Sequence, residues 1–416
     1  MARVCMVVYS TYPADPRVRR EAEALAEEGA SVDVICLRDE GERGLEEIRG
    51  VRAIRLPVGR SRGGGLRYAW EWGLFTVMSF AVVTWLHLVR RYHVVHVHNM
   101  PDFLVASALF PRFSGARLVL DLHDPTPEVF MTKYGIGKGR LLTRALVRLE
   151  EWSIRVAHAV LTPNEAFRRL FVARGCPEGK ISIVMNSPQE SVFARPAGGA
   201  EDSGGRAGHV LMYHGTIVER HGLGRALEAV ARLRDEMPDI EFRVFGDGDW
   251  VDEFARRVEE RGLGGRVRYH GRVTLETIAR EIPEADAGVV PNERTPFTEL
   301  NLPTRIFEYL AMGRPVVAPR TTGVLDYFGE DDLFLFEPGD AEDLARAVRR
   351  ALTSGPERDA VLERGMAVYS RHRWAIEAER LVGIYERLLG LPAPGEPERV
   401  AGPHLVRRPE PERRAA

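Results

Sequence analysis

The feature that most constrains the fold of this chain is an alternation, found twice, of short apolar segments and helix-length stretches. The apolar segments are rich in Val and Ile, which favour strands, and each is too short for an ordinary helix. In the first half they lie at residues 3–9, 32–37, 93–98, 117–122, 158–162 and 181–185. In the second half they lie at residues 209–215, 241–248, 266–273, 287–291, 314–319 and 333–340. Buried strands that alternate with helices are typical of a parallel sheet covered on both faces, so we predict two doubly wound, Rossmann-like α/β domains.

A Gly- and Ala-rich stretch without apolar periodicity, residues 195–208, separates the two series and predicts a linker. We therefore place an N-terminal domain at residues 1–194 and a C-terminal domain at residues 209–370. Residues 371–390 carry an amphipathic pattern that predicts a terminal helix, and residues 391–416, rich in Pro, Glu and Arg, predict a disordered tail. Two such domains are expected to face each other across a cleft, with ligands bound beyond the carboxyl ends of the strands.

The composition indicates a globular protein with 44% hydrophobic residues and 28% charged residues. The net charge of −2 provides no basic field that would predict nucleic-acid binding. The three cysteines, Cys5, Cys36 and Cys176, lack metal-site spacing, and we interpret them as reduced, buried thiols. Residues 3–9 are predicted to be a first strand, so we expect no signal peptide and a cytoplasmic protein.

One apolar stretch, residues 72–86, needs a separate explanation because arginines flank it on both sides. A helix that spans a membrane needs about 20 apolar residues, and Glu71 and His87 make this stretch shorter. Three interpretations remain open, namely a buried core helix, a helix docked into one membrane leaflet, and a true span. The second would place the protein peripherally on the inner face of the membrane.

Residues 301–319, NLPTRIFEYLAMGRPVVAP, predict a helix followed by a buried strand. Pro303 suits the first helical turn, where its missing N–H has no partner to lose. The amides of the next three residues would then form an anion site with the helix dipole, and these residues are Thr304, Arg305 and Ile306. Glu308, one turn further on, suits neutral hydroxyls such as those of ribose. The alternative is an ordinary amphipathic helix with a solvated glutamate.

Residues 213–230 predict a loop between a strand and a helix that could approach the same ligand. Gly215 and Gly222 permit a tight backbone, and Arg220 could contact a diphosphate. His221 lies beside it, and the sequence leaves its protonation at neutral pH open. The alternative is a plain connecting loop with a surface arginine.

Residues 121–130, DLHDPTPEVF, follow a strand of the first domain and bring three titratable groups together. We predict that His123, Asp124 and Glu128 converge on the side of the cleft that faces the second domain. The alternative is a helix start, with Asp124 and Pro125 forming a turn. Asp121 and Asp124 could suggest a metal, but Asp121 is expected to point into the strand, so we predict no metal site.

Two further stretches argue against other functions. Residues 245–250, FGDGDW, look like a metal-binding triplet but are better explained as a glycine turn after a strand. Residues 10–21, the first connection, lack the Gly-rich fingerprint of a dinucleotide enzyme. Arg17 in this connection could face the cleft, although a solvated arginine is the favoured interpretation.

With these segments the chain resembles the retaining glycosyltransferases of the GT-B fold, and within them family 4, the bacterial polysaccharide type. The resemblance rests on the segments YHGTIVERHGL, FRVFGDGD, VRYHGRV, FEYLAMGRPVVAP and FEPGDAEDLARAV, which occur in the order and spacing of that family. HNMPDFL and LDLHDPTPE resemble its first domain. The likeness covers residues 3–390, and its more specific part is the C-terminal half.

The resemblance implies a nucleotide sugar bound mainly by the second domain and an acceptor bound mainly by the first, with the terminal helix at residues 371–390 crossing back onto the first domain. The residues that we place on the acceptor side are Arg17, Asp124 and Glu128. By position, Glu308 matches the glutamate that holds the donor ribose, and Arg220 falls in the loop with the diphosphate-binding cations. His123 matches the histidine near the transferred sugar. Arg272 and Val273 fall where the nucleobase meets backbone.

The chain departs from the family pattern at several positions. The family often has a second glutamate eight residues before the one that matches Glu308, and here that position is Leu300. Either the adjacent Glu299, or Asn301 with backbone amides, must then hold the sugar hydroxyls. His221 stands where the diphosphate loop usually has a lysine, and Thr216 stands where an earlier arginine is common.

The resemblance implies a hexosyltransferase-type reaction with retention, in which a sugar moves from a nucleoside diphosphate to a hydroxyl acceptor. No cofactor or metal is expected beyond the nucleotide-sugar co-substrate, because arginines and the helix start can bear the charge. No covalent nucleophile stands out. The expected acceptor is a lipid-linked saccharide in cell-surface polysaccharide synthesis, because residues 72–86 suggest a membrane contact. A nucleotide-sugar 2-epimerase and a non-catalytic nucleotide-sugar-binding protein remain alternatives.

Overall fold

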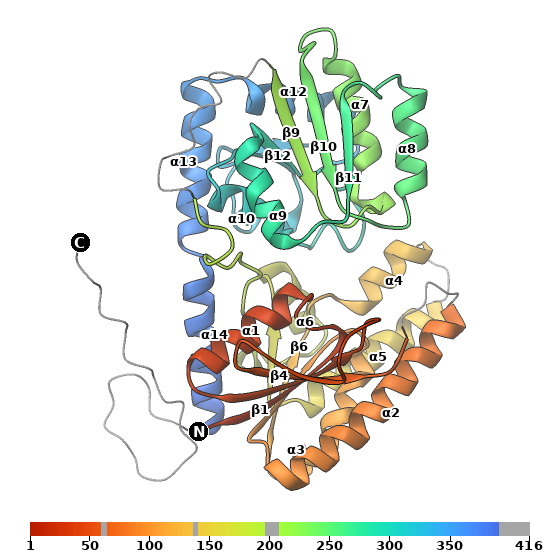
Figure 1. Ribbon diagram of the computed structural model, residues 1–416, viewed down its shortest axis with the longest axis vertical. Coiled ribbons are helices and arrows are strands. Elements are labelled where there is room, and N and C mark those ends of the chain that lie inside the picture. Colours follow the sequence, from red (N-terminus) through yellow and green to blue (C-terminus); the bar gives the residue numbers. More distant parts are fainter. Residues whose placement is uncertain (60–64, 136–139, 196–207, 391–416) are drawn as a thin grey trace, which may run out of the picture. The chain divides into compact units, whose positions relative to one another are not determined.

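The computed structural model describes residues 1–59, 65–135, 140–195 and 208–390. The predicted tail, and nearly all of the predicted linker, therefore lie outside the described residues. The chain divides into two compact units (Figure 1). Unit 1 comprises Met1–Pro163, Phe167–Val184 and the chain from Glu377 onward, and unit 2 comprises Asn164–Ala166 and Met185–Ile376.

Unit 1 is built on an eight-stranded sheet with the order β3-β4-β2-β1-β5-β6-β7-β8. Its strands are β1 (Arg3–Thr11), β2 (Ser31–Leu37), β3 (Leu45–Ile48), β4 (Val51–Leu56), β5 (Val94–His98), β6 (Arg117–Asp121), β7 (Ala159–Thr162) and β8 (Ile181–Ile183). Its helices are α1 (Pro16–Glu27), α2 (Gly65–Arg90), α3 (Leu109–Phe113), α4 (Thr126–Tyr134), α5 (Arg140–Val156), α6 (Glu165–Ala173) and α14 (Trp374–Leu389). Neighbouring strands run parallel except β3 and β4.

The antiparallel pair β3 and β4 is absent from the sequence prediction. It is a hairpin at the edge of the sheet, and Arg49 and Gly50 form its turn with φ values of 51° and 77°. Two consecutive positive φ values match the tight turn that suits the twist of a hairpin. β3 is exposed or half-buried along its length, so its sequence lacks the apolar run that marks the buried strands.

Helix α2 presents its apolar side chains to solvent. Its exposed positions follow a helical spacing and include Trp70, Leu74, Val77, Phe80, Ala81, Trp85, Leu88 and Val89, which we call the α2 stripe. The inward positions include the polar residues Glu71, Thr76, Ser79 and His87. Only 33% of its most apolar window is buried, so the interpretation as a buried core helix is wrong. Within the described residues, α2 is the one helix whose length and composition would suffice to cross a membrane.

Unit 2 is built on a six-stranded parallel sheet with the order β11-β10-β9-β12-β13-β14. Its strands are β9 (His209–His214), β10 (Ile240–Phe245), β11 (Val267–Gly271), β12 (Ala287–Val289), β13 (Val316–Pro319) and β14 (Phe334–Phe336). Its helices are α7 (Leu223–Leu233), α8 (Val251–Glu260), α9 (Leu275–Glu281), α10 (Thr304–Ala311), α11 (Thr322–Leu325), α12 (Ala341–Leu352) and α13 (Pro356–Ser370). The prediction of two Rossmann-like α/β domains is confirmed.

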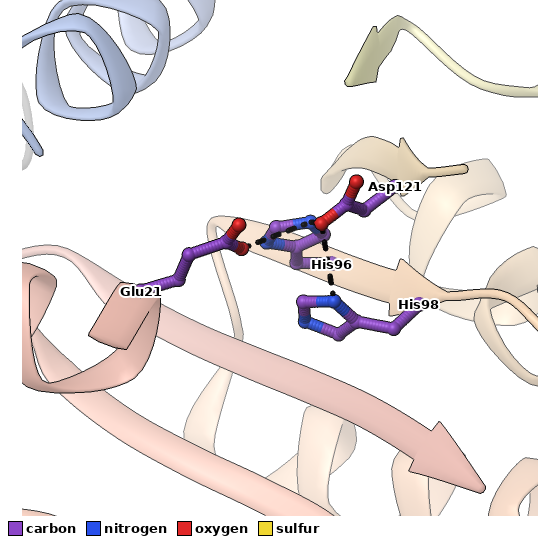
Figure 2. Close-up of side chains that lie close together, drawn as sticks. All are labelled: Glu21, His96, His98 and Asp121. Carbon is purple, nitrogen blue, oxygen red and sulfur yellow. Dashed lines mark ion pairs between the residues drawn. The ribbon is translucent and has the colours of Figure 1, made fainter. Parts of the chain in front are cut away.

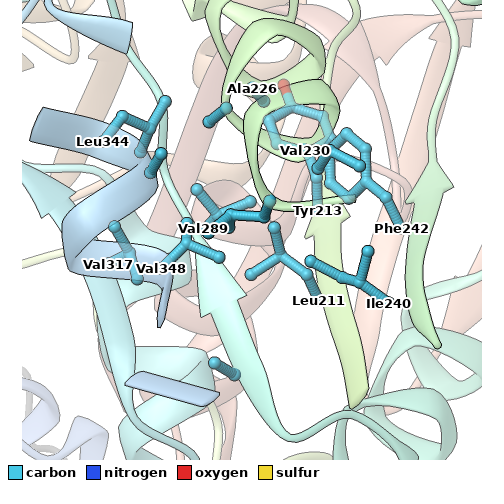
Figure 3. Packing of buried hydrophobic residues seen from close by; sticks show 14 of the residues in the cluster. Leu211, Tyr213, Ala226, Val230, Ile240, Phe242, Val289, Val317, Leu344 and Val348 are labelled. Atoms are coloured by element: carbon cyan, nitrogen blue, oxygen red, sulfur yellow. The ribbon is translucent and has the colours of Figure 1, made fainter. Parts of the chain in front are cut away.

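Two apolar layers cover the two faces of the unit 2 sheet, and β9 contributes to both. Leu211 and Tyr213 pack in the layer under α7 and α12 (Figure 3), while Val210 and Met212 pack in the layer under α9 and α10. Successive side chains of a strand point to opposite faces, so a strand buried on both faces must be apolar throughout. This burial fixes the position of β9, and with it the loop that follows.

Candidate functional site

The loop after β9 packs closely against α10, and glycine makes the approach possible. Gly215 has a φ of 133°, and a Cβ at this position would lie 3.0 Å from the guanidinium of Arg305. Gly246, which follows β10, has a φ of 142°, and its Cβ would come within 1.8 Å of the carbonyl of Gly215. Only glycine combines these backbone angles with this lack of space.

Two arginines at this edge of the unit 2 sheet have no carboxylate partner within the described residues. Arg305 donates from Nη1 to the carbonyl of His214 at 3.0 Å, and its Cζ lies 4.8 Å from the ring centroid of Tyr213. Arg220 lies 5.9 Å from the ring centroid of Phe297. Both are half-buried, so their charges are partly removed from water yet unneutralised by an ion pair. Such an arrangement favours an anionic ligand.

Two histidines beside Arg305 are buried and neutral. Burial, followed by the charge of Arg305, lowers the pKa of His214 and of His221 to about 3. His221 Nδ1 lies 2.7 Å from the carbonyl oxygen of Thr216, so the ring is engaged with the loop itself. His221 therefore carries no positive charge at neutral pH and does not replace the family's lysine as a cation. Thr216 is exposed.

Helix α10 points its first turn and Glu308 toward the same place. The helix begins at Thr304, and Pro303 is its N-cap, one position earlier than predicted. The amide of Ile306 donates to the carbonyl of Pro303 at 3.1 Å. It is therefore not one of the free amides that the sequence predicted for an anion site. Glu308 is buried, and its Oε2 lies 3.2 Å from His214 Nε2. The interpretation of Glu308 as a solvated surface residue is wrong.

Glu299 is engaged in holding the loop before α10. Its Oε1 accepts from the amide and the hydroxyl of Thr322, at 3.0 and 2.6 Å, and its Oε2 lies 3.0 Å from Arg294 Nε. These contacts oppose the idea that Glu299 turns to hold a sugar. Asn301 is half-buried, and its side chain makes no hydrogen bond to the residues that the structure describes.

The predicted base-contacting residues follow β11. Arg272 is exposed and Val273 is half-buried. Both are accessible to a ligand. Neither makes a side-chain hydrogen bond within the part of the chain that the structure describes.

In unit 1 the carboxyl ends of β5 and β6 carry a buried ionic network. His98 and Asp121 are paired in the register of the two strands. His98 Nδ1 lies 3.3 Å from Asp121 Oδ2, and His123 Nε2 lies 3.2 Å from the same oxygen. The side chain of His123 is 18% exposed, whereas those of His98 and Asp121 are fully buried. His123 is thus the member of this group that a ligand can reach, and its Nε2 side is fixed from within.

Arg17 is part of this network, and its interpretation as a solvated arginine is wrong. It is 4% exposed and donates to both oxygens of Asp121, at 2.7 and 2.8 Å. A third bond, of 2.8 Å, runs to the carbonyl of Val184. Although burial would raise it, the Arg17 charge and the contacts to His123 hold the pKa of Asp121 well below its usual value. The predicted acceptor-side role of Arg17 is unsupported because its guanidinium is already occupied.

Glu21 and His96 lie close to Asp121 and His98 (Figure 2), and neither residue was predicted from the sequence. His96 Nε2 lies 3.9 Å from Glu21 Oε2 and 3.9 Å from Asp121 Oδ2, and His96 Nδ1 lies 2.8 Å from the hydroxyl of Tyr385 in α14. Burial raises the pKa of Glu21 well above its usual value and lowers that of His96 well below. The two-residue spacing of His96 and His98 in HVVHVH places both on one face of β5, a signal that could have found them.

The spacing of four of these groups would suit a metal ion. Glu21, His96, His98 and Asp121 each bring a ligand atom within 4.8 Å of the others. However, Arg17 bonds both oxygens of Asp121 and also lies 3.2 Å from Glu21 Oε1. The guanidinium thus supplies, at the same oxygens, the positive charge that a metal ion would bring. The negative charge of Asp121 is therefore balanced by Arg17.

The other two predicted acceptor-side residues lie at the start of α4. Glu128 is buried in an ion pair with Arg174, so its carboxylate is directed into unit 1. This placement contradicts a role on the ligand side. Asp124 is half-buried, and its carbonyl accepts from Asn99 Nδ2 at 2.8 Å.

Comparison with protein families gives matches in both halves of the chain. A model described as "Glycosyl transferase 4-like domain" matches residues 14–187. A model described as "Glycosyl transferases group 1" matches residues 208–354. Together the two matches cover more than half of the chain. The first match lies mostly in unit 1, and the second lies in unit 2.

Among curated proteins, the 2-deoxystreptamine glucosyltransferase of Streptomyces kanamyceticus is 25% identical over 401 residues, which are 90% of this chain and 98% of that protein. The lipopolysaccharide core biosynthesis glycosyltransferase LpsE of Rhizobium meliloti is 32% identical over 158 residues, or 38% of this chain and 43% of that protein.

Among solved structures, sucrose-phosphate synthase from Thermosynechococcus elongatus has a TM-score of 0.76 at 20% identity. The superposition covers 93% of this chain and 99% of the chain of that protein. HepE of Anabaena in complex with UDP-glucose has a TM-score of 0.70 at 15% identity. Its superposition covers 93% of this chain and 100% of the HepE chain. These likenesses show the fold.

Proposed function

Because this chain belongs to the group 1 glycosyltransferases and has the GT-B fold, we propose that it transfers a sugar with retention from a nucleoside diphosphate to a hydroxyl acceptor. The proposal includes a hexosyl donor, no metal ion, and a lipid-linked saccharide as acceptor. Three features support it, namely the arginines without carboxylate partners in unit 2, the partly exposed His123 of unit 1 and the α2 stripe.

The observation that carries the donor assignment is the pair of arginines without carboxylate partners. Arg220 and Arg305 lie at the carboxyl edge of the unit 2 sheet, where open α/β sheets bind ligands. The start of α10 adds backbone amides and the positive end of a helix dipole. A diphosphate fits this combination, and HepE, which shares the fold, was solved with UDP-glucose. Glu308 would hold neutral hydroxyls of the ribose, because its charge disfavours a phosphate.

In the proposed reaction, the anomeric C–O bond to the diphosphate breaks as a new bond forms to the acceptor oxygen on the same face of the sugar. Negative charge grows on the leaving diphosphate, and Arg220, Arg305 and the start of α10 would stabilise it. The acceptor's proton would pass to the leaving phosphate. His123 would orient the sugar or acceptor, with Asp121 holding the ring. Because two guanidinium groups would face the diphosphate, we propose that the reaction needs no metal ion to neutralise the developing charge.

The α2 stripe supports the assignment of a lipid-linked acceptor. Large apolar side chains in a row on an outer face mark interaction surfaces, because isolated exposure is common but contiguous exposure is not. Trp70 and Trp85 lie on the outward face of the helix, whereas several of its polar residues lie among the inward positions. Tryptophan favours the interface between water and lipid. We therefore infer that α2 lies in one leaflet on the cytoplasmic side.

The donor proposal is tested by thermal stabilisation with a panel of nucleotide sugars. The expected result is a rise in melting temperature with at least one nucleoside-diphosphate sugar, and Glu308→Ala should lose most of it. Glu363→Ala, which changes an exposed residue of α13, is the matched control and should keep it. An unchanged shift in Glu308→Ala would remove Glu308 from the site. Conversion of the donor into an epimeric nucleotide sugar in the absence of any acceptor would contradict a transferase.

The membrane contact is tested by flotation with phosphatidylcholine vesicles. Trp85→Ser combined with Leu88→Ser should weaken binding at least tenfold, because burying each large apolar side chain contributes about 1.5–3 kcal/mol. The control combines Leu45→Ser with Leu325→Ser, which removes two exposed apolar side chains outside α2. Equal binding of all three proteins would reject the α2 contact.

A further inference from the structure

A cavity of about 560 Å³ lies in unit 1, at the edge of the sheet opposite the candidate site. Arg3 begins β1, Arg117 begins β6, and His93 directly precedes β5, so the lining comes from the amino ends of these strands. Asp121 and His98 end β6 and β5. The length of these strands, about 3.3 Å per residue, separates the cavity from the ionic network.

The lining of the cavity is positively charged. Arg3, Arg91 and Arg117 contribute to it, and no Asp or Glu does. Arg3 and Arg117 donate from Nε only to backbone carbonyls, those of Arg91 at 3.1 Å and Leu388 at 3.2 Å. Within the described residues none of the three arginines has a carboxylate partner. Their charges converge on a concave space that no described acidic group neutralises.

Two histidines also line the cavity, and both favour the neutral form. Burial, followed by the charge of Arg91, lowers the pKa of His87. Burial, followed by the charge of Arg3, lowers the pKa of His93. His87 Nε2 lies 2.6 Å from the hydroxyl of Ser114, and His93 Nε2 lies 3.3 Å from Arg3 Nη2, so the two rings add polar groups without charge beside the arginines. The cavity thus offers guanidinium donors together with neutral polar groups, which suits an oxyanion such as phosphate.

The rim of the cavity is apolar on the side of α2 and α3. Leu88, which belongs to the α2 stripe, lines the cavity, as does Phe110 of α3. Phe113, three residues further along, is 78% exposed. A ligand that fits both parts carries a negative charge next to an apolar chain. A free anion would leave the rim uncovered.

We propose that this cavity binds the phosphodiester headgroup of an anionic lipid while the α2 stripe contacts the acyl region. The assignment rests on the proposed membrane contact of α2 and is independent of sugar transfer. It adds a second anion-binding site to the chain, in unit 1, which serves to hold the protein on an anionic leaflet.

The test is flotation of the full chain with phosphatidylcholine vesicles that contain or lack phosphatidylglycerol. Binding should be tighter to the anionic vesicles. Arg91→Gln combined with Arg117→Gln should reduce this gain by about fivefold per arginine, or roughly 25-fold together, and should leave binding to neutral vesicles unchanged. Both residues are exposed, so the fold should tolerate the change.

The matched control combines Arg49→Gln with Arg148→Gln, which removes two charges of unit 1 outside the cavity. An equal loss in control and cavity variants would mean general attraction to a charged surface and would overturn the site. Stabilisation by soluble glycerol phosphate without any preference for anionic vesicles would overturn the lipid assignment. The thermal shift with nucleotide sugar should be the same in all variants, so failure here is separate from failure of the proposed reaction.

Discussion

The carboxyl edges of the two sheets use arginine in opposite ways. In unit 1, Arg17 is buried and bonded to both oxygens of Asp121, with Glu21 beside it. In unit 2, Arg305 is half-buried, donates to a backbone carbonyl and has no carboxylate partner in the described chain. The first arrangement is electrically complete, and the second has a positive charge left over. The same type of fold thus builds a closed ionic network in one unit and, in the other, leaves an arginine without a carboxylate partner among the described residues.

The histidines show the same contrast. In unit 1 the ring of His123 is held by Asp121 and reaches the surface, whereas in unit 2 His214 and His221 are buried next to a cation. A neutral histidine near an arginine adds no repulsion and leaves the arginine's charge available. We infer that unit 2 attracts the charged part of the donor, and that unit 1 orients a neutral part.

The largest expected effect is on the stability of unit 1. Arg17→Met would leave Asp121 buried without its partner, and the loss of one partner of a buried ion pair typically costs about 3–5 kcal/mol in the free energy of unfolding. Chemical unfolding followed by circular dichroism measures this difference. Arg148→Met, a change at an exposed arginine, should cost no more than about 0.5 kcal/mol. A small effect of Arg17→Met would show that the unit 1 network is not closed as described.

The next effect is on the reaction. Arg305→Gln should lower kcat by about 10²–10³-fold, because the loss of one group that stabilises developing negative charge costs roughly 2.7–4 kcal/mol. Steady-state kinetics with a donor from the nucleotide-sugar panel gives this number. Arg268→Gln on β11, which changes an exposed arginine of the same unit, should behave like the unchanged protein. Equal rates for both variants would remove the distinction between the two sheet edges.

The smallest effect concerns pH and the neutral state of His221. Its pKa is about 3 in the folded chain and about 6.5 when unfolded, so between these values the unfolded state binds more protons. The free energy of unfolding of unit 2 should therefore fall as the pH drops below 6.5, by at most about 1.4 kcal/mol per pH unit from this group. His221→Gln should flatten the curve. If the free energy of unfolding depended on pH in the same way in both proteins, the pKa of His221 would be the same in the folded and unfolded states.

Much of the architecture follows from local sequence, because a strand buried on both faces must be apolar along its whole length. The strands of both sheets and the segment from α10 to β13 were predictable for this reason. The hairpin was not, because β3 is an exposed edge strand that needs no apolar run and because β4 interrupts its apolar residues with Arg52 and Arg55. Glu308, Arg220 and His123 were chosen through their place after strands and through resemblance.

The closed network of unit 1 was harder to predict. Arg17 and Asp121 are 104 residues apart, and nothing in the local pattern distinguishes a buried arginine from a solvated one. The orientation of α2 was also ambiguous, because a helix that is apolar on nearly every side does not reveal which face is inward. Only packing against η1 (Asp102–Ala108) and β1 settles it.

The contact of Tyr385 with His96 has a consequence for how the polypeptide matures. These partners are separated by 289 positions, and Leu381 and Ile384 on the same helix are buried as well. During translation from the amino terminus, the first unit cannot acquire its final packing until the last helix has left the ribosome. A chain cut before Trp374 would expose His96 to water. We expect such a chain to be recovered as an aggregation-prone intermediate even though its sheet is whole.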